Sequence, residues 1–214
     1  MAKQATSAAN FLPAKLDLKS LAAAAEHCRG CHLYANATQT VFGQGTARAK
    51  VVFVGEQPGD AEDLAGQPFV GPAGKLLDRV LIEVGIDREA VYVTNAVKHF
   101  KWTPRGKRRM HAKPGAREIS ACRPWLEAEL AVIQPEVLVC LGATAAQALL
   151  GRTFRLTEQR GQAFASDWAR WTLATYHPSA VLRSLGRDGG DEVYEAFRTD
   201  LQLVARKIGK LAAK

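Results

Sequence analysis

The histidine at position 111 lies in the most basic segment of the chain. Residues 98–117 contain no acidic side chain. Eight cationic side chains occur there: Lys98, Lys101, Arg105, Lys107, Arg108, Arg109, Lys113 and Arg117. A flexible loop of this kind could bind nucleic-acid phosphates, or it could be a solvated basic loop without a ligand. A neutral imidazole within it is a potential nucleophile, because the ordinary histidine pKa is about 6.5 and neighbouring cations favour the neutral form.

Four cysteines form a second group that could do chemistry. Cys28 and Cys31 make a CxxC pair, and Cys122 and Cys140 follow with seventeen residues between them. On spacing alone, a zinc site and a [4Fe–4S] cluster are both compatible with this pattern. Cys140 lies within an apolar run and could instead be a small buried side chain.

The elements that must position these residues alternate along the chain. Short, β-branched apolar runs at 50–55, 90–97, 136–142 and 171–177 predict buried parallel strands. Helical patterns are found at 17–28, 72–85, 121–134, 142–151 and 191–214. This alternation predicts an α/β fold with three layers, α/β/α, around a central, mainly parallel four-stranded sheet.

Length and composition predict one domain. The chain has 214 residues, of which 47% are hydrophobic, so it can bury one substantial core. We expect a weakly ordered tail at 1–15 and a single domain at 16–214. No apolar run is long enough to span a membrane, and the first residues lack the apolar segment of a secretory signal. These features predict a cytoplasmic protein without a membrane partner, whose cysteines are reduced or metal-bound.

Polar residues and glycines follow each predicted strand. In open parallel sheets, functional residues gather beyond the carboxyl ends of the strands, so we expect one site at this edge. The turn after the first strand, GEQPGD at 55–60, lacks the GxGxxG spacing of a dinucleotide-binding loop. A Rossmann cofactor site is therefore disfavoured.

Four motifs in this order resemble those of the uracil-DNA glycosylase superfamily, and specifically its iron–sulfur branch related to family 4. They are GEQPGD at 55–60, PFVGPAG at 68–74, TNAVKHF at 94–100 and HPSAVLR at 177–183. The sequence KRRMH at 107–111 is similar to that of the UdgX class. In that class an inserted histidine bonds covalently to the DNA from which the uracil has been removed.

The resemblance implies how a flipped-out uracil would be held. Phe69 would stack on the ring, and the amide of Asn95 would pair with O4 and N3–H, a pattern that cytosine cannot match. His177 and backbone N–H groups around Gln57 would stabilise negative charge on O2. Without the resemblance, Phe69 would be assigned to the core and Asn95 to a strand-end cap or a turn. For His177 the alternative is a capping or core histidine, which its position at the end of a strand, on the same edge as the other polar residues, disfavours.

The resemblance also implies the chemistry at the sugar. Glu56 or Asp60 would stabilise the cationic sugar, and Glu56 would orient His111 and accept its proton. His111 would attack C1′ and leave the protein attached to the DNA after one turnover. Two alternatives remain: a multiple-turnover family 4 glycosylase that releases abasic DNA, and a non-catalytic nucleic-acid-binding protein.

The remaining expectations concern DNA contacts, the metal and the partners. The expected DNA-binding residues are Lys107, Arg108, Arg109, Ser179 and Arg183. Arg109 could equally anchor the loop to the protein, and Leu182 or Arg183 could fill the gap that the flipped base leaves. The resemblance assigns Cys28, Cys31, Cys122 and Cys140 to a structural [4Fe–4S] cluster. The expected partner is single- or double-stranded DNA containing uracil, with uracil as product, and the protein is expected to be a monomer.

Overall fold

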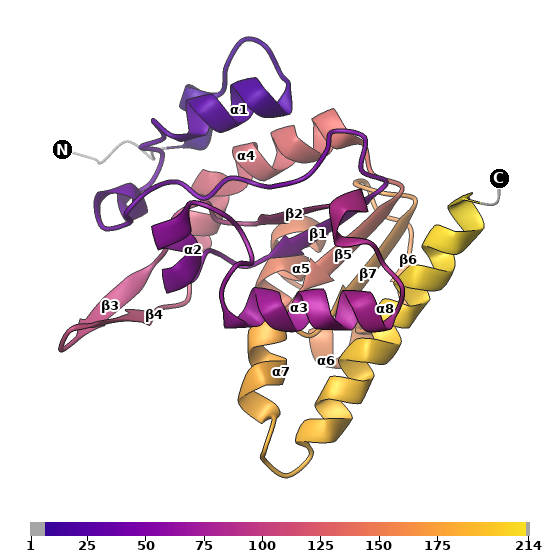
Figure 1. Cartoon of the computed structure of the whole chain (residues 1–214). Coiled ribbons are helices and arrows are strands. Elements are labelled where there is room, and N and C mark those ends of the chain that lie inside the picture. The colour runs from indigo at the N-terminus through magenta and orange to yellow at the C-terminus, as the bar shows by residue number, and fades with distance from the viewer. Residues whose placement is uncertain (1–6, 213–214) are drawn as a thin grey trace.

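The structure, a computed structural model, describes residues 7–212 and has one central sheet. The strand order is β2-β1-β5-β7-β6 (Figure 1). The strands are β1 Val51–Gly55, β2 Val91–Asn95, β5 Val137–Leu141, β6 Ala163–Phe164 and β7 Trp171–Thr175. The first four strands in this order run parallel, and β6 is antiparallel to β7. The α/β/α prediction is confirmed, but the sheet has five strands rather than four. The two-residue β6 is too short to produce a hydrophobic pattern.

Helices cover both faces of the sheet (Figure 1). On one face lie α3 Pro72–Glu83, α7 Pro178–Ser184 and α8 Gly190–Ala212, which pack with Val51 and Phe53 of β1. On the other lie α4 Ala116–Ile133 and α5 Ala143–Leu150, which pack with Val52 and Val54. Successive strand side chains point to opposite faces, so a strand buried on both faces needs an unbroken apolar run. The four predicted strands are such runs.

Shorter elements complete the chain. They are η1 Ala8–Phe11, α1 Leu18–Ala25, η2 His32–Ala35, α2 Asp60–Ala65, η3 Arg88–Ala90 and α6 Leu156–Gln159. Helix α1 packs outside α4 in a third apolar cluster, to which Ala8 also belongs. Ala8 is fully buried, so residues 8–11 are part of the folded body rather than a weakly ordered tail. Residues 1–6 of that predicted tail lie outside the described residues.

The central part of the basic segment, residues 102–111, is a β-hairpin rather than the flexible loop that its charge suggested. Strands β3 Trp102–Arg105 and β4 Arg108–His111 pair antiparallel and extend from the body beside α2 (Figure 1). Gly106, the first of the two turn residues, has a φ of 59°, which glycine adopts without strain and hairpin turns require. Because directly paired residues share a face, Arg109 and His111 lie on the same face as Trp102.

Candidate active site

The three residues expected to hold the base converge on Gly55, the last residue of β1. Asn95 ends β2, and His177 follows β7 by two residues. A Cβ placed on Gly55 would lie 2.4 Å from Asn95 Oδ1, 2.7 Å from Phe69 Cζ and 3.4 Å from His177 Nε2. The rings of Phe69 and His177 are nearly parallel, with centroids 6.2 Å apart. An aromatic ring, an amide and an imidazole therefore all lie against Gly55, where a larger residue would clash with them.

The PFVGPAG motif explains how Phe69 reaches this space. Phe69 has a φ of 59°, in the left-handed region that non-glycine residues rarely adopt. Gly71 caps α3 and Pro72 occupies its first turn, which suits a residue without an N–H. A Cβ at Gly74 would lie 1.7 Å from the Phe69 carbonyl oxygen, so the helix can approach this strained turn only at a glycine. The turn and the helix start together fix the Phe69 ring.

His177 is held as a neutral hydrogen-bond donor. It is the N-cap of α7, and its Nδ1 accepts a hydrogen bond from the backbone N–H of Ser179 at 3.1 Å. Because Nδ1 accepts, the proton of the neutral ring is on Nε2, the nitrogen near Gly55. Burial, together with the nearby His111 and Arg183, lowers the pKa of His177 to about 4. The ring thus offers an N–H to the space beside Gly55 at neutral pH.

The residues expected to act at the sugar also lie together. Glu56 Oε1 is 3.4 Å from His111 Nε2, and Oε2 accepts a hydrogen bond from the Thr144 hydroxyl of α5. The His111 side chain is half exposed, and its ring lies 6.2 Å from that of Phe100. The carboxylate is therefore held at one oxygen by the body of the protein and faces the hairpin imidazole with the other. Thr144 was not among the predicted site residues.

The side chain of Gln57 holds the base of the hairpin rather than facing the pocket. Its Nε2 donates to the carbonyls of Lys101 and Ala112 at 3.1 and 3.2 Å, and its Oε1 accepts from the Lys101 N–H. These residues directly precede β3 and follow β4. Within residues 7–212 no acceptor is recorded for the Gln57 backbone N–H. That N–H remains a candidate donor to a bound base.

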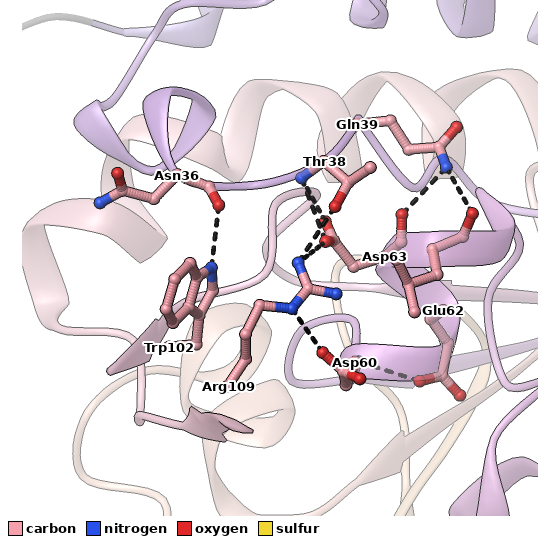
Figure 2. A network of polar contacts seen from close by, with 10 residues as sticks. Asn36, Thr38, Gln39, Asp60, Glu62, Asp63, Trp102 and Arg109 are labelled. Atoms are coloured by element: carbon pink, nitrogen blue, oxygen red, sulfur yellow. Dashed lines mark hydrogen bonds and ion pairs between the residues drawn. The ribbon is translucent and has the colours of Figure 1, made fainter. Parts of the chain in front are cut away.

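Arg109 fastens the hairpin to α2 (Figure 2). Its Nε donates to Asp60 Oδ1 and its Nη1 to Asp63 Oδ2, each at 2.6 Å, and Nη1 also reaches the Thr38 hydroxyl at 3.0 Å. Asp63 is fully buried and accepts a further hydrogen bond from the Thr38 N–H. The Trp102 indole donates to the Asn36 carbonyl at 2.8 Å. Asp60 is thus engaged by Arg109, and His111 is carried on an anchored strand.

The other cations of the segment differ in their availability to DNA. Arg105, Lys107 and Arg108 are exposed at the tip of the hairpin. Lys98 is fully buried in an ion pair with Glu129, so it is not available to bind phosphate. Ser179 and Arg183 lie one turn apart within α7, and Arg183 Nη1 donates to Ser179 Oγ at 3.3 Å. Lys101 pairs with Glu118.

Three of the four cysteines share one apolar cluster, and the fourth lies elsewhere. Cys28, Cys31 and Cys122 belong to the cluster between α1 and α4. Cys28 Sγ accepts from the Trp125 indole and Cys122 Sγ from the Lys98 N–H, both at 3.2 Å. Cys140 is in the middle of β5, fully buried among apolar residues of a different cluster. The arrangement therefore does not fit the four-cysteine ligand set expected from the sequence.

A buried imidazole lies next to the three grouped cysteines. His99 is 5% exposed and directly follows Lys98, whose N–H contacts Cys122. The Thr40 hydroxyl donates to the Ala25 carbonyl at 2.8 Å, so His99 Nε2 must be the donor in its 2.9 Å contact with Thr40. The lone pair of the neutral ring is then on Nδ1, as in histidines that bind metals. Within the described residues, no three His, Cys, Asp or Glu side chains converge on the position of a single ion.

Comparison with known proteins decides the family. The model of the uracil DNA glycosylase superfamily matches residues 42–202, which include Gly55, the side chains around it and the hairpin. The chain belongs to this superfamily. It is 37% identical over 196 residues to a type-4 uracil-DNA glycosylase of Archaeoglobus fulgidus, covering 87% of this chain and 89% of that protein. It is 41% identical over 160 residues to the type-4 uracil-DNA glycosylase of Thermotoga maritima, covering 73% and 79%.

Within the superfamily fold, the structure brings most of the expected residues to one edge of the sheet. Glu56, Phe69, Asn95, His111 and His177 surround the end of β1. Sequence reasoning missed the residues that support them, chiefly Thr144 and Asp63, because a threonine after a strand and an acid in a first helical turn are common in any protein. No helix in the described part of the chain is long and apolar enough to cross a membrane.

Proposed function

We propose that this protein removes uracil from DNA and that His111 then bonds to C1′ of the resulting abasic site. The observation that carries the proposal is the placement of His111 Nε2 3.4 Å from Glu56 Oε1, next to the pocket at Gly55, on a hairpin anchored by Arg109. The type-4 glycosylases named above support the first step. Covalent capture rests on the hairpin geometry and on the resemblance to the UdgX class.

Recognition begins when the uracil nucleotide is extruded from the helix, at a cost of a few kcal/mol. The base enters the space at Gly55, where Phe69 stacks on its face. The Asn95 amide donates to O4 and accepts from N3–H. Cytosine has a donor at C4 and no proton on N3, so it would leave both groups of the amide unpaired, and this mismatch excludes it.

Cleavage breaks the bond between N1 and C1′, and its electron pair leaves with the base. Negative charge gathers on uracil O2, where the Nε2–H of His177 and the backbone N–H of Gln57 can donate. A neutral histidine suits this role because its low pKa keeps the proton arrangement fixed between pH 5 and 8. The Glu56 carboxylate stabilises the positive charge that develops on the sugar.

Capture forms a new bond between C1′ and a ring nitrogen of His111. One nitrogen supplies the lone pair, and the proton on the other passes to Glu56, which leaves a neutral N-alkyl imidazole. Such a group is a poor leaving group, so the adduct persists. Arg109 favours this outcome by restricting the hairpin, because attack requires the imidazole rather than water to occupy the position facing C1′.

Multiple turnover is the second candidate, and the similarity to type-4 uracil-DNA glycosylases is equally consistent with it. In that case Glu56 activates a water at C1′, abasic DNA is released and His111 only contacts the substrate. The two candidates share every step up to bond cleavage. They differ in whether the protein remains on the DNA.

DNA binding is assigned to the exposed cations at the hairpin tip, Arg105, Lys107 and Arg108, with Ser179 and Arg183 as a second contact region. Arg109, which was also expected to bind DNA, serves as the hairpin anchor, because Asp60 and Asp63 engage its Nε and Nη1 and its Nη2 is buried away from solvent. A wedge role for Leu182 or Arg183 remains part of this proposal.

A [4Fe–4S] cluster is proposed to bind between α1 and α4, with Cys28, Cys31, Cys122 and His99 as its ligands. The shared apolar cluster of the three cysteines and the lone pair on His99 Nδ1 support this set, whereas the position of Cys140 within β5 does not. A cluster bound there would supply folding free energy, because its ligands would join the segment after α1 to α4 and to the segment after β2.

A denaturing gel tests the proposed function. Wild-type protein is mixed with labelled single-stranded DNA that contains one uracil, heated in SDS and separated. The proposal predicts a slower band that contains both protein and DNA. Free DNA that breaks at an abasic site on alkali treatment, without the slower band, would support the multiple-turnover candidate. DNA that remains intact and unshifted would refute both.

A further inference from the structure

An ammonium group fully shielded from solvent lies behind Asn95. The side chains of Lys98 and Glu129 are both 0% exposed and form an ion pair. Besides Glu129, Lys98 Nζ donates to Thr94 Oγ1 at 2.6 Å and to the backbone carbonyl of Asn95 at 2.9 Å. An ammonium has three donors, and these contacts use all of them. The charged form of Lys98 is therefore fully hydrogen-bonded at the end of β2.

The carboxylate of the pair is equally well satisfied. Glu129 Oε1 accepts from the Tyr92 hydroxyl at 2.8 Å, the Thr94 hydroxyl at 2.9 Å and the Gly43 N–H at 3.2 Å. Burying two charges costs much of what their attraction returns, and apolar replacements of such pairs are often as stable. Stability alone is thus a weak reason for placing this pair next to a residue that faces the substrate pocket.

The contact with Asn95 continues as a chain of hydrogen bonds toward the pocket. The Asn95 carbonyl that accepts from Lys98 belongs to the same peptide group as the Ala96 N–H, which donates to the Gly55 carbonyl at 2.9 Å. That carbonyl in turn shares a peptide group with the N–H of Glu56. Hydrogen bonds in series polarise one another, and the effect is stronger in a buried environment. The positive charge therefore acts both on the backbone of Asn95 and on the start of the GEQPGD motif.

We propose that Lys98 is a positioning residue for uracil cleavage. It fixes the backbone of Asn95 so that the side-chain amide faces the space at Gly55, and its charge favours the negative charge that develops on the departing base. The inference rests on the proposed reading of uracil by Asn95. The Lys98 N–H also donates to Cys122, so the same residue connects the pocket to the cysteine cluster.

The test compares two leaving groups. DNA with uracil or 5-fluorouracil is cleaved with protein in excess, so that one turnover is observed. Fluorine withdraws electrons and makes the base a better leaving group, which needs less stabilisation. The double variant Lys98→Met/Glu129→Gln removes both charges together. We expect uracil cleavage to slow at least about ten-fold, cleavage of 5-fluorouracil to slow less, and affinity for uracil-free DNA to stay unchanged.

A matched control separates positioning from general loosening. Tyr92→Phe removes a hydrogen bond to the same Glu129 without touching Asn95, so its ratio of 5-fluorouracil to uracil cleavage should equal that of wild type. An unchanged ratio in the double variant as well would overturn the inference. If that variant does not fold, Lys98→Gln/Glu129→Gln, which keeps polar side chains at both positions, replaces it. This variant too is expected to raise the ratio of 5-fluorouracil cleavage to uracil cleavage above that of wild type. Wild-type protein that cleaves neither base would instead refute the proposed function.

Discussion

A single methyl group at Gly55 should close the base pocket. In Gly55→Ala the new Cβ would lie 2.4 Å from Asn95 Oδ1 and 2.7 Å from Phe69 Cζ. A carbon and an oxygen normally approach to about 3.4 Å, so the amide must move by about 1 Å. Displacements of this size at a reacting centre can slow a reaction about 100-fold, and the crowding itself costs about 1–3 kcal/mol of stability.

The assay measures uracil release with protein in excess, together with affinity for uracil-free DNA. Gly55→Ala should lose about two orders of magnitude in the rate of release while its DNA affinity remains unchanged, because phosphate contacts supply most non-specific binding. Gly209→Ala is the matched control. This glycine lies in α8, and a Cβ added to it would meet no atom within 4 Å outside the helix backbone, so the change should leave release unaffected and stabilise the protein by about 1 kcal/mol. Uracil release by Gly55→Ala at the wild-type rate would show that the base does not bind at this position.

Three further outcomes are expected. Arg109→Met should release uracil but form the covalent adduct about ten-fold more slowly, because the hairpin loses its anchor. Arg108→Ala should mainly weaken DNA binding and reduce its dependence on salt. Equal rates of adduct formation in the two variants would contradict the anchoring role of Arg109. Cys140→Ala should keep the iron content and brown colour of the purified protein, whereas His99→Ala should lose iron. The opposite result would support Cys140 rather than His99 as the fourth ligand of the cluster. In proton NMR spectra the His177 ring should not titrate between pH 8 and 5, and titration near pH 6.5 would refute the buried neutral ring. Because the pKa of His177 is lower in the folded than in the unfolded protein, the free energy of unfolding should fall as the pH drops from about 6.5 toward 4.

The sequence predicts the sheet and the location of the site because both depend on local patterns. Strands β1, β2, β5 and β7 are continuous apolar runs, and the carboxyl ends of parallel strands necessarily share one edge. The motifs after those strands therefore meet without knowledge of any side-chain contact. By contrast, β6 has two residues and exists only through its pairing with β7.

Long-range pairing accounts for what the sequence could not reveal. A count of lysines and arginines cannot distinguish the buried Lys98, whose partner Glu129 lies 31 positions away, from the exposed Lys107. The sequence places Cys122 in a predicted helix and Cys140 in an apolar strand, but only the packing of these elements shows that the two cysteines belong to different apolar clusters. Arg109 could be assigned to the anchor rather than to DNA only once Asp60 and Asp63 were located.

The number of uracil molecules released per protein molecule distinguishes covalent capture by His111 from multiple turnover. Wild-type protein and His111→Ser are each incubated with a ten-fold excess of uracil-containing DNA, and free uracil is measured until release stops. We expect wild-type release to end at one uracil per protein, with all of the protein still bound to DNA after denaturation. His111→Ser leaves space for a water at C1′ and should continue to release uracil without forming an adduct. Wild-type release that proceeds through all of the DNA with no stable adduct would contradict covalent capture by His111.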